Sequence, residues 1–392
     1  MKFVILLIIM TITTFSCKDK ESETIIPVKP QEARIDFYSE ISAQQMKSMV
    51  SGYGFGSVAY KIKHDVRVGK ITYTTTFNGK PVNASGLIFI PKVTGSTLPV
   101  FCFNHGTTFR KSDAPSVKQE ITGAEFIASS GYITIMPDYL GYGASADIFH
   151  PYYDAKHSAS VVIDAINATQ EYAAKNNISS SKRVFMAGYS EGGYVTLAAQ
   201  KYIEANSKIN WDLVAVAAGA GGYDLTHMLS TLTAEDYFSY PAYLAFLTQA
   251  YNLTYGWNKP LNHFFSDKYA SALEGNMDGS KDGGYINNLL TTDLTDLFEP
   301  TFYSQLKAGK GNGFLEALQK NSLTDFAPKA PLRFYHGTND EVIPLSNSQV
   351  TMEKLKTNGG TNISLKVIQG GNHGSSFVPM AGDFIPWFEG LK

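Results

Sequence analysis

The sequence predicts an α/β fold with a mostly parallel, doubly wound sheet and one helical insertion. Short apolar runs rich in β-branched and aromatic residues recur along the chain and alternate with segments of helical periodicity. Most of these runs are continuously apolar, as expected of parallel strands that helices cover on both faces. The 34 glycines suit the many tight strand-to-helix turns of such a fold.

Composition and charge limit the classes of function. With 392 residues, of which 44% are hydrophobic and 17% charged, the chain can bury one large core or two modest ones. The formal net charge is -2, and basic residues form no block along the chain. The sequence therefore lacks the positive surface that nucleic-acid binding requires, and we expect no nucleic-acid partner.

The first residues predict export. Lys2 precedes an apolar run from Phe3 to Met10, which small residues follow up to Cys17. A signal peptide over residues 1–16 has this organisation, and its apolar run is too short to span a membrane as a mature helix. An ordinary secretory signal followed by an incidental cysteine is the alternative to the lipid attachment considered next.

The stretch Thr14–Cys17 resembles a lipobox, in which the cysteine becomes the lipidated first residue of the mature protein. This resemblance implies acyl chains on Cys17 and a tether over residues 17–45, which begins with charged residues and prolines. The membrane is then a partner through the lipid anchor, and the expected location is the bacterial envelope, at the outer membrane. Cys102 has no disulfide partner, and its apolar surroundings predict a buried, inert thiol.

The first two predicted strands form a hairpin, because Asn78 and Gly79 between them are a strong turn signal. The later strands alternate with helices, which implies parallel pairing. The predicted strands are Ile71–Phe77, Ala84–Ile90, Val100–Phe103, Tyr132–Met136, Val184–Ala187, Leu213–Ala218, Leu332–Tyr335 and Ser364–Ile368. Helical patterns between them cover Ala155–Tyr172, Tyr194–Ala205 and Ser346–Lys356.

One interval breaks this alternation. Residues 223–329, between two predicted strands, are several times longer than the roughly 30 residues of a strand–helix unit. We interpret them as a helical cap over a site, inserted into a core of residues 46–222 and 330–392; a peripheral elaboration without substrate contact is the alternative. The helices expected in the cap are Ala234–Tyr251, Lys268–Glu274, Leu289–Leu297, Phe302–Ala308 and Phe314–Lys320.

A candidate nucleophile lies before the second of the core helices. Residues Gly188 to Gly192 read Gly-Tyr-Ser-Glu-Gly and fit the pattern G-x-S-x-G. The pattern alone is weak, but here it follows a buried strand and opens a helix, which is the setting that a nucleophilic serine requires. The sharp turn forces an unfavourable backbone on Ser190, and the two glycines remove side chains that would collide. We therefore predict Ser190 as the nucleophile rather than only a helix cap.

A serine nucleophile needs a base that is held by an acid. Two loops at the C-terminal ends of later strands carry such groups, Asp340 in one and His373 in the other. We predict His373 as the base and Asp340 as the acid that orients it. His105 is an alternative base. Asp224 is an alternative acid, although its place at an apparent helix start is explained by N-capping.

The chain order Ser190, Asp340, His373 resembles that of the α/β-hydrolase fold, over about residues 50–392. Among its branches the chain is most similar to the secretory lipase and esterase group. The segments that carry this likeness are Asn104–Thr108, Pro137–Gly143, His150–Tyr152 and the Gly-Tyr-Ser-Glu-Gly-Gly turn. The resemblance implies a carboxylic-ester hydrolase that acts on a small-molecule, lipid or glycan ester without a cofactor. It also implies an oxyanion hole built from the backbone N–H groups of Glu191 and Thr107.

No metal site is expected, because the remaining histidines lack carboxylates or cysteines at ligand spacing. The segment Asp278–Gly283 is similar to a calcium loop, but Leu289 stands where the closing glutamate should be. We interpret this segment as a polar turn.

Two other functions stay open. The acid loop His336–Pro344 also resembles that of prolyl oligopeptidases, which favours a serine peptidase. The roughly 50 residues before the catalytic fold leave no room for an N-terminal propeller, which argues against it. The third possibility is a binding lipoprotein on an inactive hydrolase scaffold, and the intact set of serine, histidine and aspartate argues against that.

Overall fold

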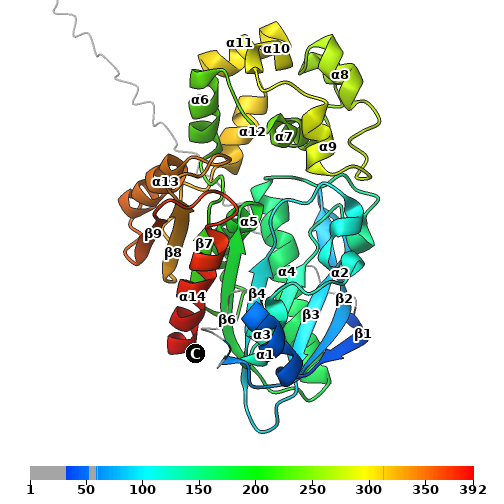
Figure 1. Ribbon diagram of the computed structural model, residues 1–392, viewed down its shortest axis with the longest axis vertical. Helices are drawn as coiled ribbons and strands as arrows, with labels where there is room; N and C mark the ends of the chain where they lie inside the picture. Colours follow the sequence, from blue (N-terminus) through cyan, green and yellow to red (C-terminus); the bar gives the residue numbers. More distant parts are fainter. Residues whose placement is uncertain (1–31, 53–58, 60, 312) are drawn as a thin grey trace, which may run out of the picture.

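The computed structural model describes residues 32–392 except 53–58, 60 and 312 (Figure 1). The predicted signal peptide and Cys17 lie outside the described residues. In the described part of the chain nine strands form one sheet, in the order β1-β2-β3-β5-β4-β6-β7-β8-β9. β1, β2, β3 and β5 pair antiparallel, and all later pairs are parallel. The predicted fold class is thereby confirmed.

The eight predicted strands are present in the predicted order, most of them with longer spans, and β1 precedes them. The strands are β1 (Arg34–Ile41), β2 (Val66–Phe77), β3 (Lys80–Pro91), β4 (Leu98–Asn104), β5 (Ile133–Pro137), β6 (Ser180–Tyr189), β7 (Asp212–Gly219), β8 (Leu332–Gly337) and β9 (Ile363–Ile368). The hairpin between β2 and β3 turns through Asn78 and Gly79, both at positive φ, as the sequence predicted.

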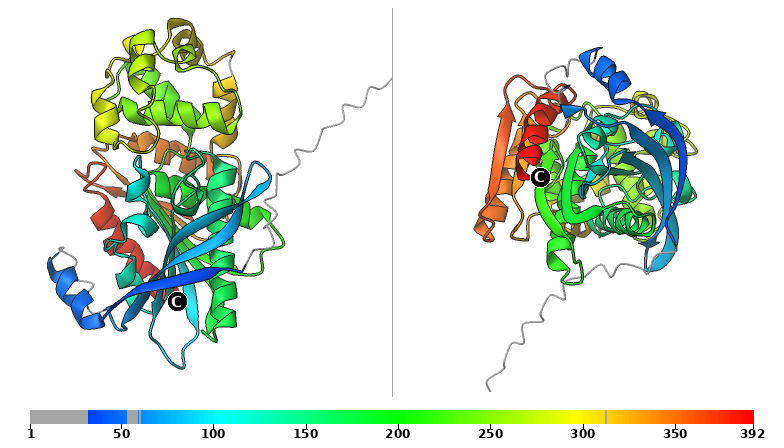
Figure 2. Two further views of the ribbon diagram at one scale, coloured as in Figure 1. Left: turned by 90° about the vertical axis from the view of Figure 1, so that its right-hand side faces the viewer. Right: turned by 90° about the horizontal axis from the view of Figure 1, so that it is seen from below.

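Helices cover both faces of the sheet, as Figure 2 shows from below. On one face lie α4 (Ala155–Lys175), α5 (Glu191–Ala205) and α13 (Leu345–Thr357); on the other lie α1 (Ala43–Gly52), α3 (Ala124–Ser129) and α14 (Phe377–Leu391). The side chains of β4 alternate between the two cores: Phe101 stacks on Phe384 of α14, whereas Cys102 faces the other side. Cys102 is buried and free, as predicted, and burial raises the pKa of its thiol, so the reactive thiolate is suppressed.

The residues between β7 and β8 build a helical layer beyond the C-terminal ends of the parallel strands (Figures 1 and 2). Its helices are α6 (Leu225–Glu235), α7 (Pro241–Thr254), α8 (Asp267–Leu273), α9 (Gly283–Asn288), α10 (Leu294–Leu297), α11 (Pro300–Ala308) and α12 (Gly313–Asn321). The layer shares one hydrophobic cluster with the sheet, and the Tyr251 hydroxyl donates to the carbonyl of Tyr153 in the core. We call residues 223–329 the cap.

The beginning of the sheet corrects the predicted boundary of the tether. β1 and the start of α1 lie inside the range 17–45, so the folded core begins well before residue 46. β1 is an edge strand with polar residues at most positions, and only Ile41 of its side chains is buried. An edge strand hydrogen-bonds to the sheet on one side only and needs few apolar residues. For this reason the sequence of β1 could not be told from that of a polar tether.

Two predicted cap helices are wrong in extent. The segment Ala234–Tyr251 contains the end of α6 and most of α7, because Asp236 adopts a left-handed conformation and Pro241 starts a new helix. The segment Leu289–Leu297 is likewise a loop followed by α10. Asp282 and Asp293 each accept a backbone N–H at the start of α9 and α10, respectively, so these caps set the true helix starts.

Candidate active site

Ser190 lies in a sharp turn between β6 and α5, at φ 60 and ψ -125. Its backbone N–H donates to the carbonyl of Gly219 on β7, which fixes the turn against the sheet. A Cβ on Gly188 would lie 2.1 Å from the carbonyl oxygen of Gly192, and one on Gly192 would lie 2.0 Å from that of Asn104. Only glycine fits at either position, as the sequence predicted, and the turn holds the Ser190 hydroxyl at the end of the sheet.

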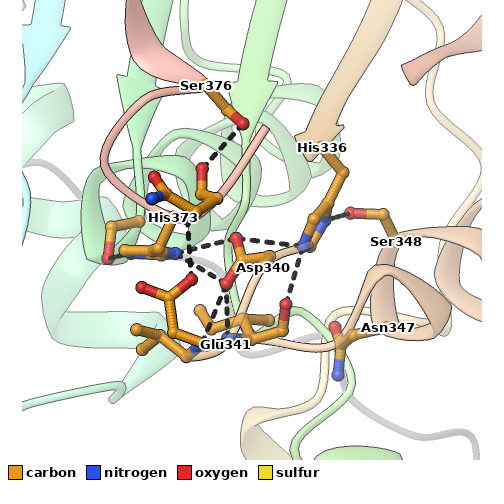
Figure 3. Close-up of polar contacts among 12 residues, drawn as sticks. His336, Asp340, Glu341, Asn347, Ser348, His373 and Ser376 are labelled. Carbon is orange, nitrogen blue, oxygen red and sulfur yellow. Dashed lines mark hydrogen bonds and ion pairs between the residues drawn. The ribbon is translucent and has the colours of Figure 1, made fainter. Parts of the chain in front are cut away.

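The structure brings the three predicted residues together. Nε2 of His373 lies 2.9 Å from Oγ of Ser190, and Nδ1 of His373 lies 2.8 Å from Oδ2 of Asp340. Asp340 follows β8 and His373 follows β9, and the two side chains meet between these neighbouring strand ends (Figure 3). Because an ionised carboxylate only accepts, Nδ1 of His373 carries the proton, and Nε2 is free to accept the proton of Ser190.

Asp340 is held as an anion. Its Oδ1 accepts the backbone N–H groups of Val342 and Ile343, and Nε2 of His336 lies 3.4 Å from its Oδ2. Burial raises the pKa of Asp340, but the hydrogen bonds from His336 and His373 outweigh it and hold that pKa well below its usual range. The carboxylate therefore stays charged at every pH at which the protein is expected to work.

Two side chains near this group were not singled out by sequence reasoning. His336 is fully buried; its Nε2 donates to the carbonyl of Ile343, and its Nδ1 accepts the hydroxyl of Ser348 (Figure 3). Oε2 of Glu341 accepts the backbone N–H of His373. The position of His336 at the end of β8, four residues before Asp340, is the signal that could have identified it.

The alternative acid and base have other partners. Oδ1 of Asp224 accepts the N–H of His227 as the N-cap of α6, and its Oδ2 lies 2.6 Å from Nζ of Lys354. His105 stacks on Tyr139 and contacts backbone carbonyls through both ring nitrogens. Within the described residues, the side chains of Ser190 and His373 thus hydrogen-bond to the predicted partners, each other and Asp340.

The loop after β4 lies against the Ser190 turn. A Cβ on Gly106 would be 3.6 Å from Cβ of Ser190, which shows how closely the two segments approach. The next residue, Thr107, has its hydroxyl 2.9 Å from that of Tyr152. This placement suits the predicted second oxyanion donor.

Two cavities meet at Ser190. An open cleft of about 530 Å³ is lined by Thr107, Ser190, His373 and the cap residue Tyr243. A second, narrow cavity of about 40 Å³ lies on the cap side of Ser190 and is lined mainly by apolar side chains, among them Phe238 and Leu247. The cap therefore forms part of the wall at the serine, as the sequence predicted for a cap over a site.

Within the described ranges, no three His, Cys, Asp or Glu side chains are grouped as a metal ion would require. The segment Asp278–Gly283 is a turn in which Asp278 accepts the N–H of Ser280. A search of the described helices for a segment long and apolar enough to cross a membrane finds none.

Comparison with known proteins decides the family. A model of the secretory lipase family matches residues 112–390. The chain belongs to this family. Lipase 9 of Candida albicans is 25% identical over 249 residues, which cover 58% of this chain and 49% of that protein. The chain thus spans about half the length of this curated relative.

Solved structures agree with the family assignment. The rice cell wall degrading esterase LipA of Xanthomonas oryzae is 25% identical, with a TM-score of 0.80 over 92% of this chain and 98% of that one. A candidate hydrolase of Legionella pneumophila has a TM-score of 0.82 at 23% identity, over 94% and 98% of the two chains. Lipase A of Candida antarctica has a TM-score of 0.64 at 15% identity, over 94% and 82%. These last two likenesses concern the fold, which is that of the α/β-hydrolases.

Proposed function

We propose that this protein is an exported serine carboxylic-ester hydrolase of the lipase or esterase type. The observation that carries the proposal is the chain of hydrogen bonds from Asp340 through His373 to Ser190, in a member of the secretory lipase family. If Ser190 only capped α5, neither the contact between Ser190 and His373 nor that between His373 and Asp340 would be needed. The substrate class is a small-molecule, lipid or glycan ester.

The proposed reaction proceeds through an acyl-enzyme. Oγ of Ser190 attacks the acyl carbonyl while Nε2 of His373 takes the hydroxyl proton, and the imidazolium then returns that proton to the leaving alcohol. Water next attacks the acyl-enzyme, with His373 again as the base, and releases the acid and the free Ser190 hydroxyl. Asp340 stays ionised throughout and holds the imidazole in the correct tautomer and orientation.

The negative charge that develops on the acyl oxygen needs donors fixed in advance. We assign the backbone N–H of Glu191, at the first turn of α5, and that of Thr107, in the loop that lies against the Ser190 turn. The start of α5 adds the positive end of the helix dipole at the same place.

Export and anchoring complete the proposal. Residues 1–16 act as a signal peptide, and lipid on Cys17 attaches the mature protein to the outer membrane. The name of the family agrees with export.

Turnover of p-nitrophenyl esters of graded chain length, measured beside aminoacyl p-nitroanilides, tests the proposal. We expect the purified wild type to hydrolyse esters and the Ser190→Ala variant to be inactive. Cleavage of the anilides alone would favour the peptidase, whereas a folded wild type that a fluorophosphonate does not label would favour the binding lipoprotein.

A further inference from the structure

A second imidazole–carboxylate pair lies directly behind Ser190. Glu191, the next residue in the chain, is 1% exposed, and its Oε1 lies 2.6 Å from Nε2 of His150, which is 6% exposed. His150 comes from the loop between β5 and α4. The pair belongs to neither the proposed proton transfer nor the contacts of Asp340.

The hydrogen bonds of His150 determine the charge of the pair. Its Nδ1 lies 2.7 Å from the carbonyl oxygen of Leu140, which can only accept, so Nδ1 carries a proton. One further proton then lies between Nε2 of His150 and Oε1 of Glu191. Whichever atom holds it, the pair as a whole is neutral.

Apart from the start of α5, His150 is the group that the described residues show paired with the Glu191 carboxyl. Its second oxygen, Oε2, is buried without a hydrogen-bond partner among the described residues. The ionisable side chains that face the pair from its own loop are Tyr139, Tyr142, Tyr152 and Tyr153, and α7 of the cap contributes Tyr243. Burial raises the pKa of all five phenols, so they stay neutral. His150 is therefore the group that balances the carboxylate.

The rings around His150 join this pair to the cap. The ring centroids of Tyr142 and Phe246 lie 4.9 and 5.9 Å from that of His150, and Phe246 belongs to α7. This packing leaves the His150 ring little freedom to move.

We propose that His150 is a positioning residue of the ester hydrolase: it neutralises the Glu191 side chain and fixes the Glu191 backbone N–H that donates to the oxyanion. The inference rests on the proposed function. A full negative charge on the side chain of the oxyanion donor would oppose the charge that develops in the transition state. By pairing with the carboxylate, His150 removes this opposition.

The test uses His150→Asn, because the asparagine amide can replace Nδ1 as the donor to Leu140 while the contact with Glu191 is lost. We expect kcat for p-nitrophenyl acetate to fall on the order of 10²-fold at pH 8, with KM little changed, as for the loss of an oxyanion donor.

The double variant His150→Asn/Glu191→Gln removes the charge while it keeps the shape of the side chain. We expect it to recover roughly tenfold or more of the kcat lost at pH 8, because the side chain next to the oxyanion donor is then neutral again. The matched control is His157→Asn, which alters another buried imidazole paired with a carboxylate, that of Asp154, away from Ser190. The kcat of this control at pH 8 should stay near the wild-type value.

Equal kcat in the single and double variants would overturn the inference, because a purely structural role of His150 predicts that result. If His150→Asn does not fold, a folded and active double variant supports the inference, and failure of both to fold overturns it. A wild type without ester turnover or fluorophosphonate labelling would instead overturn the proposed function and this inference with it.

Discussion

Asp340 receives more hydrogen bonds than the orientation of His373 alone requires. Its carboxylate accepts the N–H groups of Val342 and Ile343 and lies 3.4 Å from Nε2 of His336. The loop therefore stabilises the ionised form of Asp340. We expect Asp340→Asn to lower kcat on the order of 10⁴-fold, because His373 would adopt the wrong tautomer. Asp224→Asn is the matched control and should keep near wild-type kcat. The opposite pattern in steady-state assays would assign the acid to Asp224.

The depressed pKa of Asp340 also links its ionisation to stability. A carboxylate whose pKa is lower in the folded chain than in the unfolded chain, where it is about 3.9, stabilises the fold above that value. This contribution is lost as the pH falls through the folded pKa. We expect the melting temperature of the wild type to be higher than that of Asp340→Asn at pH 7. This difference in melting temperature should become smaller below about pH 4. A difference in melting temperature that stays the same from pH 7 to below pH 4 would contradict this link between ionisation and stability.

Ser190 and His373 should act as one unit. Ser190→Ala and His373→Ala are each expected to abolish turnover to a similar degree, and the double variant should be little worse than either. A fluorophosphonate should label the wild type once, at Ser190, and should fail to label His373→Ala, whose serine is no longer activated. Ester turnover at the wild-type rate in Ser190→Ala would reject the mechanism.

The sequence identified those site residues whose signal is local. Ser190 lies in a short glycine pattern between a strand and a helix, and Asp340 and His373 each follow a predicted strand. The pairing of His150 with Glu191 depends on how the loop before α4 folds back onto α5, and no periodicity or motif encodes that approach. Glu341 was not identified as a site residue for the same reason, because its partner is the backbone N–H of His373 in another loop.

At the scale of elements, the Ser190 turn depends on the close approach of two glycines. A Cβ on Gly188 would overlap the carbonyl of Gly192, which is backbone and cannot move aside. We expect Gly188→Ala to lower the free energy of unfolding by about 2–3 kcal/mol and to reduce turnover, as measured by urea denaturation and ester assays. Gly382→Ala, in α14 with open space around it, is the control and should be neutral or stabilising by up to ~1 kcal/mol. Equal stability of the two variants would contradict the steric argument.

The cap is expected to select the acyl group through the narrow cavity beside Ser190. Phe238 lines this cavity, whereas Tyr237, its neighbour in the chain, is 55% exposed. Phe238→Ala should enlarge the cavity and shift the preference among p-nitrophenyl esters toward longer acyl chains, with kcat/KM as the readout. Tyr237→Ala should leave the preference as it is. An unchanged preference in Phe238→Ala would mean that the cap does not form the acyl wall.

The elements that the sequence mispredicted are those that tertiary contacts and caps decide. The strands of the core were predicted because burial on both faces leaves a continuous apolar run. β1 was missed, since its residues are mostly exposed and it pairs with the sheet through β2 alone. In the cap, hydrophobic content indicated helices, but Asp236, Asp282 and Asp293 determine where they end or begin.

At the scale of the whole molecule, the sheet and the cap fold as one unit around the serine. The hydroxyl of Tyr194, on α5 directly after the Ser190 turn, lies 3.0 Å from the carbonyl oxygen of Tyr153 in the core and 2.8 Å from that of Asn321 in the cap, so its one proton bridges the two. Both contacts are buried, so removal of the cap would expose polar and apolar groups together. Single substitutions are therefore the informative way to study the cap.

We expect the location of the whole protein in the cell to depend on Cys17. The lipobox-like stretch Thr14–Cys17 leads us to expect lipid on the Cys17 thiol and retention of the mature protein in the membrane fraction, because several acyl chains together anchor stably. Metabolic labelling with a fatty-acid analogue in a bacterial host, followed by fractionation, should show a labelled wild type and an unlabelled, released Cys17→Ala. Cys102→Ala is the matched control, since its thiol is buried in β4, and it should keep both label and location. An unlabelled mature wild type that begins at another residue would instead identify residues 1–16 as part of an ordinary secretory signal.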